Sequence, residues 1–265
     1  MRRLVIVGGG RMGRSLASGL LRSGWIRPSD LAVAERYGET RRELEEHFPE
    51  VEVVEAPVPA ASAVLAVKPA DAPEACAALS RLGIARVMSI VAGVRIATLE
   101  EHLGPSTVVL RAMPNLPAVI GAGASGLAGT ASASEDDFAW AEGVLSAFGV
   151  VARMPEHLLD AVTGLSGSGP AYVLTLVEAM VDAGVGEGLD REVSRLLTVH
   201  TLLGTARMLT ELGDPAIELR ARVTSPGGTT AAGMRELERH GFRSAVIEAV
   251  AAAANRAREL GTSAH

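Results

Sequence analysis

The sequence predicts two domains of different class, a doubly wound α/β domain over residues 1–155 and an all-helical domain over residues 156–265. Short apolar runs alternate with helical stretches in the first part, which is typical of parallel strands covered by helices on both faces. A glycine motif follows the first apolar run directly and opens a helix. Beyond Glu156 the strand signals fade and helical periodicity continues.

Seven short apolar runs predict the strands of the first domain. They are Leu4–Val7, Leu31–Ala34, Val51–Val54, Ala63–Val67, Val87–Val91, Val108–Ala112 and Val150–Arg153. The helices predicted between or after them are Met12–Ser23, Glu39–Phe48, Ala72–Arg81, Ile96–His102 and Glu135–Phe148. The uncharged run over 116–134 contains Pro117 and scattered glycines, so we expect no membrane-spanning helix there.

Helix signals dominate the second domain. A long apolar helix is predicted over Leu158–Ala183, interrupted at Ser166–Pro170. Asp190 is expected to cap the next helix. Asp214 is expected to cap another, with Pro215 at its first helical position.

The last predicted helix covers Ser244–Leu260 and ends at Gly261. Alanine lines one of its faces almost throughout. Such flat helices allow close approach of a neighbour, so this helix suits a bundle formed between subunits.

Composition limits the partners. The formal net charge is −6 and no basic stripe is present, so we expect no nucleic-acid partner. Cys76 is the single cysteine, which excludes an intrachain disulfide and fits a reducing cytoplasm. The six histidines show no ligand spacing, so no metal site is expected.

The stretch Gly8-Gly9-Gly10-Arg11-Met12-Gly13 fits the GxGxxG pattern of dinucleotide-binding loops. Gly8 would make the tight turn, Gly10 would let a pyrophosphate approach, and Gly13 would let the helix pack on the strand. Together with Val7, the last strand residue before it, the motif predicts binding of NAD or NADP. An ordinary glycine turn is the alternative.

Glu35 and Arg36 follow the second strand, where the adenosine ribose of a dinucleotide is expected. Glu35 can accept hydrogen bonds from a ribose 2′-hydroxyl and would repel a 2′-phosphate. Arg36 could clamp that phosphate. A solvated surface pair is the alternative, so the sequence leaves the choice between NADPH and NADH open.

Further polar residues follow other strands at the same sheet edge. Ala66-Val67-Lys68-Pro69 contains the only lysine of the chain, which could contact a phosphate or ribose hydroxyl or extend into solvent. Ala92-Gly93-Val94 and Asn115 follow the next two strands. Asn115 can bond a nicotinamide ribose or carboxamide, or serve as a turn residue before Pro117.

The stretch Thr224–Thr230 interrupts the helical half. Pro226 disfavours a helical conformation at Ser225, and two glycines then allow close backbone approach. Two threonines follow where a new helix is predicted to begin, near Ala231. A helix start with free N–H groups and hydroxyls is suited to a small anionic substrate.

Taken together, these motifs resemble pyrroline-5-carboxylate reductases. The likeness runs from end to end and is carried by Gly8–Gly13, Ala66–Pro69, Arg111–Asn115, Val162–Tyr172, Ser225–Thr230 and Gly241–Ile247. The glycine motif is shared with many dehydrogenases, whereas the two long C-terminal motifs are much more specific.

The resemblance implies reduction of Δ1-pyrroline-5-carboxylate to L-proline by NADPH or NADH, without a metal. It implies a Rossmann domain followed by an all-α dimerisation domain, an architecture like that of 6-phosphogluconate dehydrogenase. Dimers are the unit of the family, and some members form decamers. The substrate would lie between the nicotinamide and the Ser225–Thr230 loop.

The resemblance also assigns residues. Thr230 matches the catalytic threonine, whose hydroxyl faces the ring nitrogen. Glu156 matches an acidic residue near the proline site. Thr229 and nearby backbone amides would hold the substrate carboxylate, and Ser225, Gly227 and Gly228 would also bind the substrate. Three positions depart from the family pattern: Glu35 replaces a small polar residue, Arg222 replaces an asparagine, and an asparagine usual before the fourth strand has no counterpart around Glu55–Ser62.

Three other functions fit the two-domain build. A β-hydroxyacid dehydrogenase needs a general acid or base, usually a lysine on the first long helix of the second domain, and Leu158–Ala183 contains none. Another imine reductase would use the same parts. A non-catalytic NAD(P)-sensing protein would not need the donors at Ser225–Thr230.

Overall fold

An eight-stranded sheet forms the first of two units in the computed structural model, which describes residues 1–262. Of the described residues, 1–168 and 251–262 form this sheet unit, and Gly169–Val250 form the helical unit. The division falls later than residue 155 because the segment after Glu156 packs on the sheet, where Leu159 is fully buried. Residues 263–265 of the predicted second domain lie outside the described residues.

The sheet is mainly parallel, as predicted, with the order β3-β2-β1-β4-β5-β6-β7-β8. β7 pairs antiparallel with β6, and β8 pairs parallel with β7, so these two strands run opposite to β1–β6. The sequence did not predict β7, because its glycine-rich residues lack the β-branched side chains that mark strands. The strands are β1 (Arg2–Val7), β2 (Leu31–Ala34), β3 (Glu52–Val54), β4 (Ala60–Leu65), β5 (Arg86–Ser89), β6 (Val108–Met113), β7 (Gly123–Gly129) and β8 (Gly149–Arg153).

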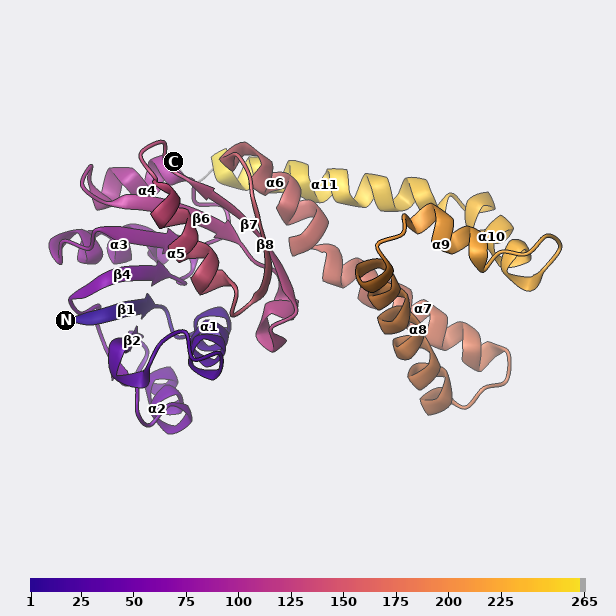
Figure 1. Ribbon diagram of the computed structural model, residues 1–265, viewed down its shortest axis with the longest axis horizontal. Helices are drawn as coiled ribbons and strands as arrows, with labels where there is room; N and C mark the ends of the chain where they lie inside the picture. The colour runs from indigo at the N-terminus through magenta and orange to yellow at the C-terminus, as the bar shows by residue number, and fades with distance from the viewer. Residues whose placement is uncertain (263–265) are drawn as a thin grey trace. The chain divides into compact units, whose positions relative to one another are not determined.

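Helices cover both faces of the sheet, which confirms the doubly wound arrangement (Figure 1). One face packs on α1 (Arg11–Arg22), α2 (Gly38–His47) and α5 (Glu135–Leu145), and the other on α3 (Ala72–Arg81), α4 (Ile96–Leu103) and α6 (Leu159–Val162). Short turns complete the unit: η1 (Pro28–Asp30), η2 (Pro69–Asp71), η3 (Leu116–Ile120), η4 (Glu156–Leu158) and the π-helical turn η5 (Thr163–Gly167).

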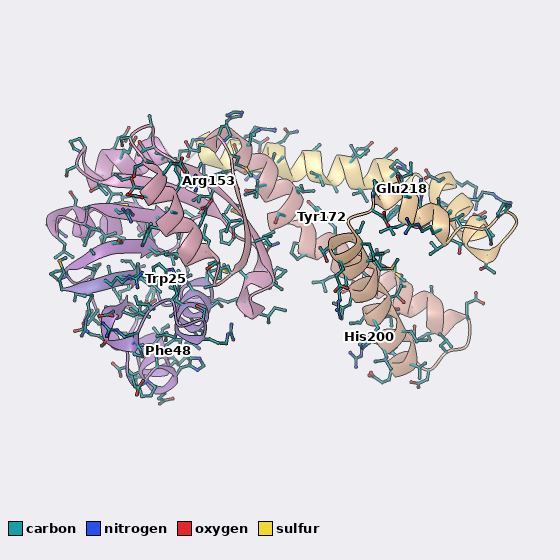
Figure 2. The ribbon with its side chains drawn as sticks, viewed as in Figure 1. Trp25, Phe48, Arg153, Tyr172, His200 and Glu218 are labelled. Atoms are coloured by element: carbon teal, nitrogen blue, oxygen red, sulfur yellow. The ribbon has the colours of Figure 1, made fainter. Side chains whose placement is uncertain are left out.

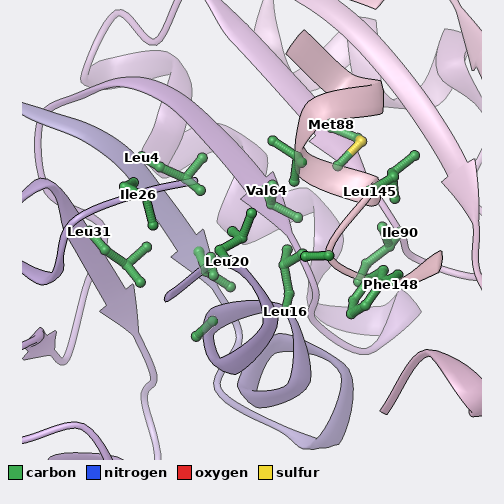
Figure 3. Close-up of a cluster of buried hydrophobic side chains, with 14 of the residues drawn as sticks. Leu4, Leu16, Leu20, Ile26, Leu31, Val64, Met88, Ile90, Leu145 and Phe148 are labelled. Atoms are coloured by element: carbon green, nitrogen blue, oxygen red, sulfur yellow. The ribbon is translucent and has the colours of Figure 1, made fainter. Parts of the chain in front are cut away.

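Strand alternation divides the core into two clusters. Leu4 and Ile6 of β1 belong to the cluster under α1, whereas Val5 and Val7 belong to the cluster on the opposite face. Successive side chains of a strand point to opposite faces of the sheet, so the side chains on both faces of β1 are buried. Figure 3 shows the first cluster, in which Leu16 of α1 lies among strand and α5 side chains.

Two antiparallel neighbours, α7 (Gly169–Gly186) and α8 (Arg191–Leu212), begin the helical unit. The carboxylate of Asp190 accepts the N–H groups of Glu192 and Val193 at 2.9 and 3.3 Å, so the predicted cap is confirmed. A Cβ on Gly184 would lie 2.2 Å from Ser194 Oγ, so this glycine permits the close packing of α7 against α8.

Two predicted helix ends are wrong. Pro215, not Asp214, occupies the N-cap position of α9 (Ala216–Arg222), because the carboxylate of Asp214 pairs with Arg222 at 2.7 Å instead. The last helix, α11 (Phe242–Thr262), continues through Gly261. Gly261 is buried, and a Cβ there would lie 3.3 Å from the Arg95 guanidinium, so this glycine serves close packing rather than helix termination.

Candidate nucleotide site and substrate loop

The glycine motif forms the turn between β1 and α1. Gly8 has a φ of +106°, and a Cβ there would lie 2.5 Å from the carbonyl oxygen of Ala66. A Cβ on Gly13 would lie 1.9 Å from the carbonyl oxygen of Gly8, so only glycine lets α1 pack on the turn. Apart from its chain neighbours, no atom of residues 1–262 lies within 4 Å of a Cβ built on Gly10, which leaves that backbone open to a ligand.

A cavity of about 470 Å³ opens beside this turn, at the carboxyl ends of β1, β2 and β4. Ligands of open α/β sheets bind at this edge. Of the residues predicted to bind the cofactor, the cavity is lined by Val7, Gly8, Gly10, Glu35, Arg36, Ala66, Val67 and Lys68. The others do not line it: Gly9, Arg11, Met12, Gly13, Pro69, Ala92, Gly93, Val94 and Asn115.

Glu35 is buried, with 8% of its surface exposed, so the alternative of a solvated surface pair is wrong for this residue. Its Oε2 accepts the N–H of Gly9 at 2.8 Å, and its Oε1 accepts the N–H of Tyr37 at 3.0 Å. Because both carboxylate oxygens bond backbone groups, Glu35 links the glycine turn to the end of β2.

Arg36 is partly exposed and lines the cavity. Its guanidinium donates to Asp71 Oδ1 at 2.8 Å and to the Tyr37 hydroxyl at 2.7 Å, and it lies 4.8 Å from the centre of the Tyr37 ring. The hydrogen bond to Tyr37 and the charge of Asp71 raise the pKa of Arg36. Sequence reasoning missed Asp71, since no motif marks an acid on a short turn 35 residues away.

Lys68 is exposed and lines the same cavity. Within residues 1–262, no hydrogen bond or ion pair engages its ammonium group. The group is therefore available to an anionic ligand, and both sequence interpretations of Lys68 stand.

Asn115 lies away from the cavity, after β6. Its Nδ2 donates to Ser166 Oγ at 3.1 Å, and its Oδ1 accepts the N–H of Ala124 at 2.9 Å. The side chain therefore joins the start of β7 to η5. Gly93, with a φ of +78°, lies in the turn between β5 and α4.

Glu156 holds the start of α4 near β6. Its Oε1 accepts the N–H of Ile96 at 2.7 Å and a hydrogen bond from Arg111 at 2.9 Å. The Arg111 side chain is only 3% exposed. Arg95 pairs with the buried Asp160 at 3.0 Å nearby, so two ion pairs fasten the segment after β8 to the sheet unit.

In the helical unit, the predicted loop leads into α10 (Thr229–Arg239), which begins two residues before the predicted Ala231. Gly227 has a φ of +71°, and Gly228 is the N-cap residue, without a side-chain cap. Ser225, Thr229 and Thr230 are exposed, and their hydroxyls make no hydrogen bond within residues 1–262. The loop therefore presents unused donors.

His200 lies exposed on α8 (Figure 2). In the described part of the chain, no three His, Cys, Asp or Glu side chains gather as metal ligands would. No helix within residues 1–262 has both the length and the hydropathy needed to cross a membrane.

Comparisons with known proteins cover both units. A family model described as pyrroline-5-carboxylate reductase dimerisation matches residues 156–260. A model described as NADP oxidoreductase, coenzyme F420-dependent, matches residues 3–93.

Similar proteins match the chain along nearly its whole length. The pyrroline-5-carboxylate reductase of Synechocystis sp. is 41% identical, covering 98% of each chain. A reductase structure from Coxiella burnetii is 35% identical with a TM-score of 0.91, and a Plasmodium falciparum one with NADP bound is 28% identical with a TM-score of 0.84; both cover 98% of each chain. The chain therefore belongs to the pyrroline-5-carboxylate reductase family.

Proposed function

We propose that the protein reduces Δ1-pyrroline-5-carboxylate to L-proline with NADPH or NADH, the last step of proline biosynthesis. The observation that carries this proposal is the 41% identity to a pyrroline-5-carboxylate reductase across 98% of both chains. In the reaction the imine carbon gains a hydride and the ring nitrogen gains a proton, so the C=N bond becomes a secondary amine, while the cofactor is oxidised to NADP⁺ or NAD⁺.

The residues around the cavity fit a dinucleotide. The open backbone at Gly10 and the turn at Gly8 would hold the pyrophosphate, and Arg36 and Lys68 would lie toward the phosphate or ribose groups. When bound, the reduced nicotinamide supplies the hydride. Ala92–Val94 and Asn115 remain candidates for the nicotinamide end.

The loop of the helical unit would bind the substrate. N–H groups at the start of α10, with the hydroxyls of Ser225 and Thr229, would hold the carboxylate, because a helix N-terminus favours an anion. Gly227 and Gly228 would shape the loop. The Thr230 hydroxyl would hydrogen-bond the ring nitrogen and fix the imine for hydride transfer.

This chemistry needs few protein groups. If the imine binds already protonated, fixing the distance between its carbon and the hydride donor contributes most of the rate. An enzyme acting on a hydroxyl would need a general acid or base instead, and α7 contains no lysine to provide one. A site that offers only the hydroxyls of Ser225, Thr229 and Thr230 is therefore compatible with an imine reductase.

We also propose that the protein is a cytoplasmic homo-oligomer, either a dimer or a decamer built from five dimers. The match of residues 156–260 to a dimerisation model supports a dimer. The single cysteine supports a reducing compartment. Light scattering coupled to size-exclusion chromatography separates the dimer from the decamer.

One assay tests the reaction. Purified protein should consume NADPH or NADH, followed by the loss of nicotinamide absorbance, only when pyrroline-5-carboxylate is present, and proline should accumulate in equal amount. A heat-treated sample provides the blank. If neither cofactor is consumed above that blank, the proposed function is wrong.

A further inference from the structure

At the end of β2, Arg36 is a cationic side chain placed where it could recognise a 2′-phosphate. Glu35 is buried, and both its carboxylate oxygens bond backbone N–H groups. A carboxylate used in this way is a structural link in the turn. Arg36 follows it, lines the cavity, and has a guanidinium that can bind a phosphate through paired donors.

Arg36 is already engaged. One of its terminal nitrogens donates to Asp71 at 2.8 Å and to the Tyr37 hydroxyl at 2.7 Å, and its other terminal nitrogen lies 3.8 Å from Glu74. A guanidinium that bonds a carboxylate has fewer donors left for a phosphate. The two acids would also repel a doubly charged 2′-phosphate, whereas a neutral 2′-hydroxyl meets no such repulsion.

The carboxylate of Asp71 pairs with Arg36 and does not cap its own helix. It occupies the N-cap position of α3, where an aspartate commonly accepts the first free N–H groups. Here its side chain makes no cap hydrogen bond and pairs with Arg36 instead. Asp71 also lines the cavity, so its charge is next to the space that a nucleotide would occupy.

We propose that Asp71 is a specificity-determining residue that restrains Arg36 and so weakens the preference for a 2′-phosphate, which lets the protein accept NADH as well as NADPH. The proposal rests on the proposed function only in taking the cavity as the dinucleotide site. It assigns the selectivity to an ion pair between η2 and the end of β2, not to Glu35.

Calorimetric binding of NADP⁺ and NAD⁺ to the full chain, without substrate, tests the proposal. The two probes differ only in the 2′-phosphate. Asp71→Asn should raise the affinity for NADP⁺ relative to NAD⁺ by about two- to fivefold, the range expected for releasing a partly exposed ion pair. Asp71→Ser serves as a second variant, and thermal unfolding verifies that each is folded.

Two controls separate restraint of Arg36 from general repulsion. Glu74→Gln removes a nearby charge whose side chain is 84% exposed and lies farther from Arg36, so it should change the NADP⁺ to NAD⁺ ratio less. In an Arg36→Gln background, Asp71→Asn should lose most of its effect. An undiminished effect in that background overturns the proposal, as does a ratio that stays constant or falls in the Asp71 variants.

Failure of this inference is distinguishable from failure of the proposed function. The binding measurement contains no pyrroline-5-carboxylate, and the reductase assay does not depend on which cofactor is preferred. If both probes bind but no imine is reduced, the reaction is wrong while the Asp71 result stands. If neither probe binds the unchanged protein, the inference fails together with its dinucleotide site.

Discussion

The core of the sheet unit and helix α8 of the helical unit bury different kinds of side chain. In the sheet unit Leu4, Leu16 and Leu20 are fully buried. In α8 the buried residues are Ser194 and Thr198, while a row of apolar side chains is exposed: Val193 (44%), Leu196 (54%), Leu197 (54%) and Leu203 (52%). The sheet unit completes its core within one chain, whereas α8 leaves its apolar side uncovered.

This difference indicates where a second copy is needed. An amphipathic helix gains stability by burying its apolar stripe, and a large exposed apolar area on a folded chain commonly marks an interface. We therefore expect the sheet unit to be stable at any protein concentration, and the helical unit to depend on association.

The largest effects come from truncating one leucine in each unit. Leu20→Ala should lower the free energy of unfolding by about 4 kcal/mol, because a buried leucine loses its contacts and leaves a cavity. Leu197→Ala should instead weaken association, so that its melting temperature falls most in dilute samples. Thermal unfolding over a hundredfold range of protein concentration measures both.

The opposite pattern would break the comparison. If Leu197→Ala lowers the melting temperature equally at every concentration, its side chain is buried within one chain. If the effect of Leu20→Ala grows on dilution, the sheet unit also depends on a partner.

Removal of Glu156 tests whether a buried ion pair, like the apolar core, contributes to the stability of the sheet unit. Glu156→Ala should lower the free energy of unfolding by about 3 kcal/mol, because it leaves the buried Arg111 without its partner. Glu142→Ala is the matched control. It breaks the exposed pair with Arg153 and should cost about 1 kcal/mol or less.

Denaturant unfolding measures the two losses. Equal small losses would show that Glu156 has no structural role. Its main role would then be the one that the family resemblance implies, next to the substrate. A large loss of stability with an unchanged KM for pyrroline-5-carboxylate would assign Glu156 to structure alone.

Thr230 represents the opposite case, an exposed side chain whose hydroxyl the fold does not use. Thr230→Val should lower kcat about a hundredfold, the effect of removing one donor from a reacting centre, while stability stays within about 0.5 kcal/mol. Thr229→Val should act mainly on KM, because that hydroxyl would hold the carboxylate. An unchanged kcat in Thr230→Val would refute the catalytic assignment.

How far the sequence predicts the molecule depends on how local each signal is. The parallel strands and the glycine turn follow from local patterns, because apolar runs and GxGxxG determine their own neighbourhood. The pairing of Asp214 with Arg222 and of Asp71 with Arg36 is not local, so neither was predicted. The sequence interpretation gave Gly261 the usual role of glycine at a helix end. Its packing on Arg95 joins distant parts of the chain, so only the fold reveals it.

The smallest predicted effect concerns Cys76, a fully buried residue on α3 of the sheet unit. Burial raises the pKa of its thiol from 9.0 to about 11. The folded state therefore keeps the thiol protonated at a pH where the unfolded chain has lost that proton. The contribution to stability is constant below pH 9 and declines as the pH rises from 9 toward 11.

At pH 10 this decline should reach at most about 1.4 kcal/mol, since one pKa unit corresponds to that free energy. Denaturant unfolding at pH 8 and pH 10, compared between the unchanged protein and Cys76→Ala, isolates the thiol from the other groups that titrate there. The unchanged protein should lose more stability between the two pH values than the variant. Equal losses would mean that the thiol ionises as readily in the folded chain as in the unfolded one, and that this part of the sheet core admits water.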